Sequence, residues 1–335
     1  MLRYVVRRLL YTVVIVFAAV SIVFLITHLI PADPVRAMAG PHAGPEQVQS
    51  LRRQWGLDKP LAEQYFIYFR ELFRGNLGRS LLTRRSVLAD LVDYFPATLE
   101  LSLVAIMFAL VLGFPMGLAS AWKKDKWPDH LTRGGSIAAI SLPSFWLGIM
   151  LQILFFKVLG LLPVGGRLGI GEMPPHHITG LYVLDSILTG NGPALWSTCL
   201  HLILPAFTVA ASFLAVVTRM VRSSVVEVLE EDYIRTAMAK GLPLRQVLWK
   251  HALRNGLIPV VTVIGLQIGF LLGNSFVTEI VFSWPGVGLY GGRAILNLDF
   301  PAIMGVVLLI TLTYSLINLA IDLLYSKIDP RIRHQ

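Results

Sequence analysis

The sequence predicts an all-α, polytopic membrane protein with six transmembrane helices. The chain of 335 residues is 55% hydrophobic and 15% charged, and its mean hydropathy is +0.66. Soluble globular chains carry roughly 25% charged residues. The charge is also unevenly spread, because long uncharged stretches alternate with charged ones. Together these observations exclude a soluble fold.

Six stretches are long and apolar enough to cross about 30 Å of hydrocarbon, which takes roughly 20 helical residues. Each is expected to be a helix, because lipid offers no partner for backbone N–H and C=O groups. The stretches are 9–30, 99–121, 136–158, 198–218, 257–282 and 302–325. They divide the chain into an N-terminal segment with the first span (1–30), an outer helical segment (31–98), a five-helix core (99–325) and a tail (326–335).

The distribution of Lys and Arg predicts that both termini are cytoplasmic. With the N-terminus inside, the inside segments hold 17 of the 29 basic residues, and the opposite short loops hold only Arg167 and Arg293. Cytoplasmic loops collect Lys and Arg, whereas a segment as long as 31–98 crosses largely regardless of its charge. The net charge of +9 therefore reports membrane topology more than an acidic partner.

The N-terminus allows two interpretations. Arg7, Arg8 and the apolar run resemble a secretory signal peptide, with a small-residue spacing at 37–39 that suits cleavage. The run of about 22 residues is longer than a usual signal core, and Pro31 and Pro34 separate it from the small residues. A retained membrane anchor is the preferred interpretation.

The two long outside segments have different patterns. In 31–98, Pro45 and Pro60 each suit the start of a helix, and Gly56 and Gly75 suit the ends. The second predicted helix is rich in aromatic residues, which either lie at the lipid headgroups or pack on neighbouring spans. Segment 159–197, with many Gly and Pro residues, predicts an irregular loop.

The inside segment 219–256 mixes acidic and basic residues at helical spacing. Gly241 suits the position after a helix and Pro243 the first turn of the next, so a short helix is predicted at about 232–240. The charge pattern alone fits a solvated connector. Small residues along the helix favour instead a surface that the groove of another protein approaches closely; they are Thr236, Ala237, Ala239 and Gly241.

The sequence lacks signs of its own energy source or catalytic site. None of the eight lysines is followed by Ser or Thr, as a phosphate-binding Walker A loop requires. Charged residues of the predicted spans lie near their ends, which argues against a proton relay; they are Glu100, Lys157, Glu279 and Asp322. The eight histidines offer no helical pair, and His176-His177 is a weak candidate for metal. We therefore expect no catalytic residue, metal site or cofactor in this chain.

Several motifs spread along the chain resemble one family, the permease subunits of binding-protein-dependent ABC importers, in its dipeptide, oligopeptide and nickel branch. The motifs are His28-Leu29-Ile30-Pro31-Ala32-Asp33-Pro34, with Ala32 where Gly is usual, Gly56-Leu57-Asp58-Lys59-Pro60-Leu61, Gly75-Asn76-Leu77-Gly78, Pro96-Ala97-Thr98-Leu99-Glu100, Phe282-Ser283-Trp284-Pro285-Gly286-Val287-Gly288 and Asp329-Pro330-Arg331-Ile332-Arg333. The resemblance implies the type I ABC importer permease fold. It covers nearly the whole chain.

The inside segment resembles the peptide-branch form of the family's EAA loop. Ala237, Gly241 and Leu253 fit the general pattern. The departures from it match the peptide branch, and they are Arg235, Thr236, His251 and Arg254. The resemblance implies that the short helix docks on an ATPase subunit through Glu231, Asp232, Tyr233, Arg235, Thr236, Ala237, Ala239, Lys240 and Gly241. Supporting residues are His251, Leu253, Arg254 and Asn255.

The resemblance also implies a set of partners in a bacterial or archaeal cytoplasmic (inner) membrane. These are a second homologous permease, two cytoplasmic ATPases that bind ATP and magnesium, and a periplasmic or lipid-anchored solute-binding protein, with no nucleic acid. Dipeptides or short oligopeptides are the expected cargo, and nickel chelate or glutathione remains an alternative, as does a stand-alone secondary carrier or a membrane-embedded enzyme. Candidate residues for translocation or gating are Pro143, Phe145, Trp146, Glu279, Trp284 and Pro285.

Overall fold

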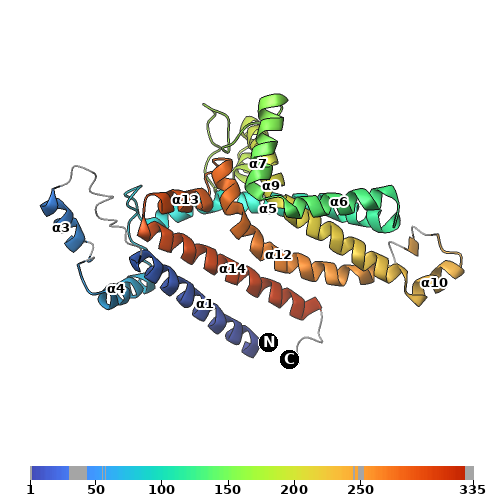
Figure 1. The fold of residues 1–335 in the computed structure, drawn as a ribbon, viewed down its shortest axis with the longest axis horizontal. Helices are drawn as coiled ribbons and strands as arrows, with labels where there is room; N and C mark the ends of the chain where they lie inside the picture. The colour runs from blue at the N-terminus through green and yellow to red at the C-terminus, as the bar shows by residue number, and fades with distance from the viewer. Residues whose placement is uncertain are drawn as a thin grey trace. The chain divides into compact units, whose positions relative to one another are not determined.

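A computed structural model describes residues 2–29, 44–54, 56, 58–243, 246–247 and 253–328 (Figure 1). The regular structure of these residues is helical, apart from one isolated bridge between Arg79 and Ser86. The helices are α1 (Leu2–Leu29), α3 (Pro45–Gln54), α4 (Leu61–Phe73), α5 (Val87–Trp122), α6 (Trp127–Ser141), α7 (Ser144–Leu151), the π-helical turn η1 (Gln152–Val158), α8 (Tyr182–Leu188), α9 (Gly192–Leu229), α10 (Asp232–Ala239), α12 (Leu253–Val281), α13 (Val287–Leu296) and α14 (Phe300–Ile328). The predicted all-α class is confirmed for this part of the chain.

The predicted spans coincide with the long helices. By length and composition, four helices of the described chain can cross a membrane, namely α1, α5, α9 and α14. A bent pair, α6 with α7 and η1, counts as one more. The predicted range 257–282 lies on the 29-residue helix α12, apart from its last residue. The chain is therefore a helical membrane protein with several spans, and six spans stay a prediction.

The third span is not the single straight helix that 136–158 predicts. The segments 127–141 and 144–158 meet at an angle of 108°. Leu142 lies between them with an extended backbone, at φ −84° and ψ 129°, and Pro143 precedes the first turn of α7. A proline disfavours the helical conformation of the residue before it, so the sequence Leu-Pro ends one helix and begins another.

Three further boundaries differ from expectation. Helix α5 begins at Val87 rather than near 99, so its 36 residues extend about 54 Å at 1.5 Å per residue, longer than a bilayer core requires. The loop 159–197 contains the short helix α8, which begins after Leu181. Helix α13 follows Gly286, in a stretch for which no helix is predicted. Apolar periodicity over 7 to 10 residues is too short to identify such helices from sequence.

The described chain divides into two compact units, and the first combines 1–97 with 285–319. Its core joins the start of α5 to α13 and α14. The buried residues are Leu77, Val87, Leu91, Val287, Tyr290, Ala294, Ala302 and Val306. Asp299 fixes the turn before α14, since its carboxylate accepts hydrogen bonds from Ser80 Oγ (2.5 Å) and from the amides of Leu81 and Leu82.

The aromatic residues of α4 lie on two faces of the helix, one packed and one exposed. The Tyr65 hydroxyl lies 2.8 Å from Ser21 Oγ on α1, and the Phe69 ring lies 4.9 Å from that of Phe17. On the other face, the side chains of Phe66 and Phe73 are 72% and 85% exposed. One face thus packs on the first span, as one of the two interpretations expects, and the exposed rings suit a lipid headgroup region.

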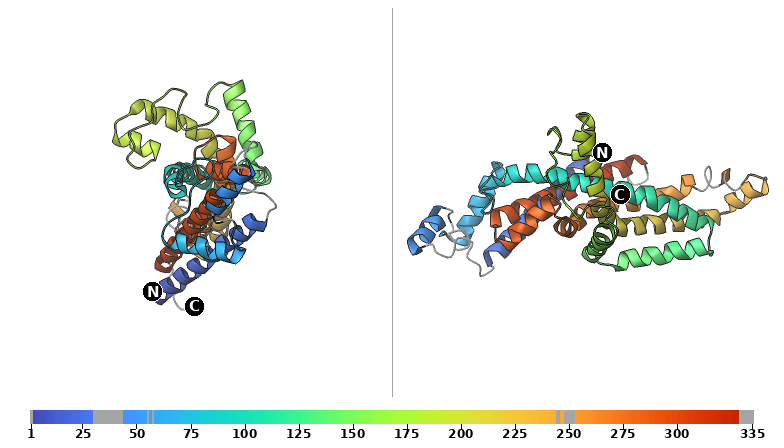
Figure 2. Two further views of the ribbon diagram at one scale, coloured as in Figure 1. Left: turned by 90° about the vertical axis from the view of Figure 1, so that its left-hand side faces the viewer. Right: turned by 90° about the horizontal axis from the view of Figure 1, so that it is seen from above.

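The second unit combines 98–284 with 320–335 and is organised around α9. Helices α6, α7, α8 and α12 all pack against α9, and α6 runs alongside it (Figures 1 and 2). Helix α5 also approaches α9 closely, because a Cβ added at Gly117 would lie 2.6 Å from the Thr218 carbonyl oxygen. Glycine at this position allows the two backbones to meet, as small residues do between membrane helices.

Candidate coupling and translocation site

The predicted short inside helix is present as α10, which spans Asp232–Ala239. Glu231 precedes it with an extended backbone, and Asp232 lies in the first turn, where a negative charge stabilises the helix dipole. Gly241 follows the helix with φ +79°. This left-handed conformation costs a non-glycine residue about 1–2 kcal/mol, so the glycine sets where the helix ends.

Helix α10 is attached to its own chain by a small part of its surface. Ile234 is fully buried and Ala237 is 7% exposed. Tyr233 and Met238 are 40% and 43% exposed on the remaining surface. The other candidate coupling residues are exposed as well, and they are Glu231, Asp232, Arg235, Thr236, Ala239, Lys240 and Gly241.

One expectation about this surface is wrong. The small-residue pattern assigns Ala237 to the surface that another protein approaches, but Ala237 faces its own chain. It lies three positions after Ile234, and residues at this spacing lie on the same side of a helix. The outward surface therefore combines Thr236 and Ala239 with the larger side chains of Tyr233 and Met238.

The residues expected to support the loop are only partly described. Leu253 begins α12 and is 4% exposed, which places it in the core of the second unit. The backbone of Arg254 and Asn255 continues α12, but their side chains, together with the whole of His251, lie outside the described residues. Gly256, just beyond them, packs on α9, because a Cβ there would lie 3.3 Å from the Ser224 carbonyl oxygen.

An ion pair with a buried carboxylate holds α6 against α9 near the end of α9 that leads to α10. Arg222 donates from Nε and Nη2 to the two carboxylate oxygens of Asp129, at 2.6 and 2.7 Å. Asp129 is fully buried and also accepts from Ser120 Oγ on α5 at 2.6 Å. Such a two-pronged contact fixes orientation as well as distance. Lys124 and Glu230 add an exposed ion pair at 2.6 Å between the same regions.

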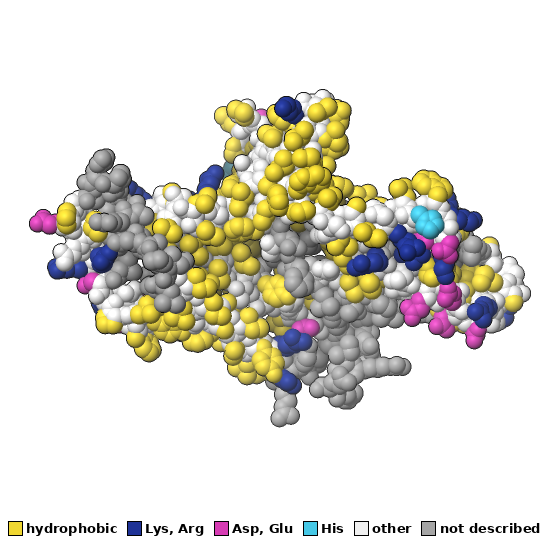
Figure 3. All heavy atoms as spheres, viewed as in Figure 1, with side chains coloured by type: hydrophobic (Ala, Val, Ile, Leu, Met, Phe, Trp, Pro, Cys, Tyr) yellow, Lys and Arg dark blue, Asp and Glu magenta, His cyan; other side chains and the backbone are white. Residues whose placement is uncertain are grey.

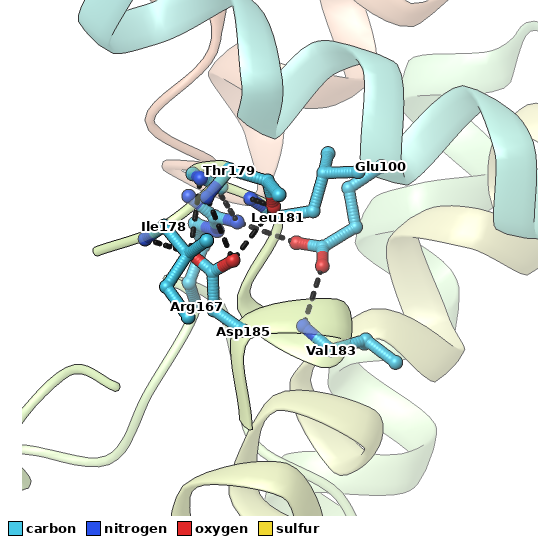
Figure 4. Close-up of polar contacts among 8 residues, drawn as sticks. Glu100, Arg167, Ile178, Thr179, Leu181, Val183 and Asp185 are labelled. Atoms are coloured by element: carbon cyan, nitrogen blue, oxygen red, sulfur yellow. Dashed lines mark hydrogen bonds and ion pairs between the residues drawn. The ribbon is translucent and has the colours of Figure 1, made fainter. Parts of the chain in front are cut away.

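A second buried ion pair lies at the loop between α7 and α9. Arg167 Nη2 donates to Glu100 Oε2 on α5 at 2.5 Å and to the carbonyl oxygen of Gly180 at 2.9 Å (Figure 4). Glu100 Oε1 accepts from the amide of Val183 at 2.7 Å. The guanidinium of Arg167 also lies 3.5 Å from the centroid of the Tyr182 ring, as in a cation–π contact. We call this set, with Asp185, the outer network.

Asp185 organises the loop backbone within the outer network. It is 1% exposed and accepts hydrogen bonds from the amides of Ile178, Thr179 and Gly180 and from Thr179 Oγ1 (Figure 4). Burial raises the pKa of this carboxyl, but the hydrogen bonds together lower it further, so the net pKa lies below its usual value. Asp185 therefore holds the loop as a carboxylate.

Sequence reasoning did not identify the outer network or the Asp129–Arg222 pair. It treats Glu100 as a charge near the end of a span, whereas Glu100 lies 13 residues inside α5. Arg167 is one of only two basic residues in the opposite short loops. An acidic residue inside an apolar helix requires a partner, so this signal is present in the sequence, but the partner is 67 residues away.

The candidate translocation residues fall into different environments. Pro143 caps α7 at the 108° bend, and Phe145 and Trp146 in the first turn of α7 are 47% and 43% exposed. Glu279 is fully buried in α12 and accepts from Ser275 Oγ at 3.2 Å. Trp284 is also fully buried, with its ring 5.7 Å from the Arg167 guanidinium. Pro285 begins the second stretch of the first unit.

These environments separate two kinds of candidate. Phe145 and Trp146 are exposed on the surface of α7. Glu279 and Trp284 are buried within the packing of α12 and the loop, where Gln152 Nε2 donates to the Val281 carbonyl at 3.2 Å. Among the described residues, no group of three or more His, Cys, Asp or Glu side chains is arranged to hold a metal ion.

Comparison with known proteins assigns the family. Residues 113–334 match the family model described as binding-protein-dependent transport system inner membrane component, and residues 1–102 match the model of its N-terminal region. The chain belongs to this family. The two matches cover both compact units, so the multi-pass helical architecture and the family assignment agree.

Relatives in this family align along nearly the whole chain. A probable D,D-dipeptide transport system permease protein of Escherichia coli (strain K12) is 47% identical over 327 residues, which cover 97% of this chain and 96% of the relative. A dipeptide transport system permease protein of Alkalihalophilus pseudofirmus is 42% identical over the full length of both chains. A glutathione transport system permease protein of Escherichia coli O6:H1 is 39% identical, also over both full lengths.

Proposed function

We propose that this chain is one of two permease subunits of an ATP-driven, binding-protein-dependent importer, with six spans and both termini in the cytoplasm. It would form half of a translocation pathway through the inner membrane. The family assignment and the full-length similarity to transport system permeases support this role. The basic residues concentrated in alternate segments support the orientation.

The proposed coupling element is α10. It presents Tyr233, Met238 and exposed charged residues, while only Ile234 and Ala237 anchor it to its own chain. This single observation carries the proposal, because two residues hold the helix to its own chain while its apolar and charged side chains stay available to another protein. ATP and magnesium would bind to two cytoplasmic ATPase subunits, and their closure would move α10 and, through α9, the spans.

The proposed cargo is a dipeptide or short oligopeptide, delivered by a periplasmic or lipid-anchored solute-binding protein. The names of the relatives with 47% and 42% identity support this cargo. Glutathione is the second candidate, and it is favoured by the relative with 39% identity. Glutathione is itself a tripeptide, so both cargoes need a pathway that accepts peptide groups; nickel chelate lacks such support.

Uptake by cells with a deletion of this gene tests both the role and the cargo. Cells that require a supplied amino acid should lose growth on dipeptides containing it and keep growth on the free amino acid, and the intact chain should restore growth. If the intact chain restores growth on glutathione and not on dipeptides, the cargo is glutathione. Recovery of an active transporter from purified chain with no ATPase subunit would contradict the proposed role and indicate a secondary carrier.

A further inference from the structure

A pocket of about 380 Å³ opens between α6 and α9 in the second unit. Basic, hydroxyl and apolar side chains all line it. The lining residues are Ser120, Thr132, Arg133, Ser136, Ile137, Ile140, Thr218, Arg219, Arg222 and Ser223. The pocket lies beside the Asp129–Arg222 pair, near the end of α9 that leads to α10, where charged side chains gather on the surface (Figure 3).

Two of the three pocket arginines have no acidic partner in the described part of the chain. Arg222 is neutralised by the buried carboxylate of Asp129. Arg133 and Arg219 are exposed and make no ion pair with any described carboxylate. The Ser136 hydroxyl, on the α6 side of the pocket, is also uncommitted among these residues. The pocket thus carries two positive charges and a free hydroxyl group, which together suit an anion.

The α6 side of the pocket changes from charged to apolar along the helix. Arg133, Ser136, Ile137 and Ile140 follow one another at positions i, i+3, i+4 and i+7, so they share one face. Ile137 is 66% exposed and Ile140 is 45% exposed. A small inorganic anion would contact only the charged end. An amphipathic ligand with an anionic head and a hydrocarbon chain would contact the whole face.

We propose that this pocket binds the headgroup of an anionic phospholipid, with Arg133 and Arg219 facing the phosphate and Ile137 and Ile140 contacting the acyl chains. Basic pockets between membrane helices on the cytoplasmic side are suited to such headgroups. The assignment to the cytoplasmic leaflet rests on the proposed orientation of the chain. The pocket and its charges are observed in the structure and do not depend on that orientation. Since Arg222, the ion-pair partner of Asp129, lines the pocket, a bound lipid would brace the α6–α9 contact close to α10.

Native mass spectrometry of the purified transporter tests the proposal, with palmitoyl-oleoyl phosphatidylglycerol as the probe and the matching phosphatidylcholine as the neutral lipid. We compare the unaltered protein with the double variant Arg133→Gln/Arg219→Gln. The matched control is Lys123→Gln/Lys126→Gln, which removes two exposed positive charges from the neighbouring turn outside the pocket. If each arginine contributes about fivefold, the pocket variant should bind phosphatidylglycerol about 25-fold more weakly, and the control less than twofold.

Each competing ligand gives a different result in the same titration. Equal weakening in both double variants, or none in the pocket variant, would overturn the proposal. Displacement of the lipid by millimolar inorganic phosphate would assign the pocket to a small anion instead, and displacement by a dipeptide would assign it to the cargo path. Absence of any retained phosphatidylglycerol in the assembled transporter would indicate that another subunit covers the face. The experiment measures lipid binding and not transport. Its result is therefore independent of whether the proposed cargo and the proposed coupling role are correct.

Discussion

Helix α10 and the outer network are held in opposite ways within the same compact unit. The outer network is almost closed to solvent, with Arg167, Glu100 and Asp185 all at most 7% exposed and joined by several hydrogen bonds. Helix α10 packs on its own chain through the buried side chains of two residues, Ile234 and Ala237, and the rest of its surface is exposed. Its one internal ion pair, between Arg235 and Asp232, is exposed at 3.4 Å.

This difference separates a region that is fixed by buried contacts from one whose surface is available to the proposed ATPase partner. Buried charges that satisfy one another resist displacement, because moving either one leaves the other unpaired in an apolar environment. Exposed ion pairs contribute little to stability. Substitutions in the outer network should therefore act on folding, and substitutions on the outward surface of α10 should act on coupling. The predictions below follow that order, from the largest expected effect on stability to the smallest.

Replacing Arg167 by Met should cause the largest loss. Glu100 would remain 4% exposed inside α5 without its cation, and breaking a buried pair from one side costs about 3–5 kcal/mol. Thermal unfolding in detergent measures the change. The double variant Arg167→Met/Glu100→Gln should recover most of the loss. If Arg167→Met alone is as stable as the double variant, an unpaired Glu100 is not the cause of the loss.

Replacing Asp185 by Asn should cost about 1.5–3 kcal/mol at neutral pH, because hydrogen bonds to a charged acceptor are lost. The pKa of Asp185 is lowered in the fold, so its contribution is present above the ordinary pKa near 3.9 and is lost as the pH falls below it. Unfolding measured from pH 7 to pH 3 should therefore show an acid-dependent loss that the variant lacks. An identical slope in both proteins would contradict this role.

Replacing Gly241 by Ala should cost about 1–2 kcal/mol in the left-handed conformation, at φ +79°. No atom lies within 4 Å of an added Cβ, so the cost comes from the backbone alone. Amide hydrogen exchange in α10 should accelerate, and Gly241→Asn should be milder, since Asn tolerates this conformation. Equal exchange in all three proteins would show that the glycine does not limit the end of α10.

Replacing Met238 by Glu should change stability least, by no more than about 0.5 kcal/mol, because the side chain is 43% exposed. Association with the ATPase subunits and peptide uptake should nonetheless be lost. The control Ile170→Glu places the same charge on a fully exposed apolar residue of the loop between α7 and α9. Pull-down of the ATPase with both variants measures the contrast, and equal recovery would contradict docking at Met238.

The sequence predicts most of the helices well and their tertiary contacts poorly. Apolar stretches of 20 residues and Pro and Gly boundaries locate α1, α3, α4 and α10, because composition alone determines whether such segments can lie in lipid or must end. Pro143 predicts a break in the helix, but the angle of the bend depends on the packing of α7 against α9 and α12. The pairing of Arg167 with Glu100 depends on tertiary contact, which local pattern does not record.

The surface of α10 shows the same limit at the level of single residues. Spacing predicts the helix, and composition identifies its small residues, but which side faces the rest of the chain depends on how α10 meets α9. Ala237 is therefore assigned to the wrong face by sequence, and Ile234 is not singled out at all. The residues that remain outward, Tyr233 and Met238 above all, are the ones on which a docking role has to be tested.

Site-specific crosslinking tests the central claim most directly. In a chain whose single cysteine is removed by Cys199→Ser, Met238→Cys and Ile170→Cys each introduce one exposed thiol. A short thiol-to-amine crosslinker applied to the assembled transporter should join position 238, and not position 170, to an ATPase subunit, with a yield that changes when ATP is added. Crosslinking of neither position, or of both equally, would contradict the account of α10 as the coupling helix.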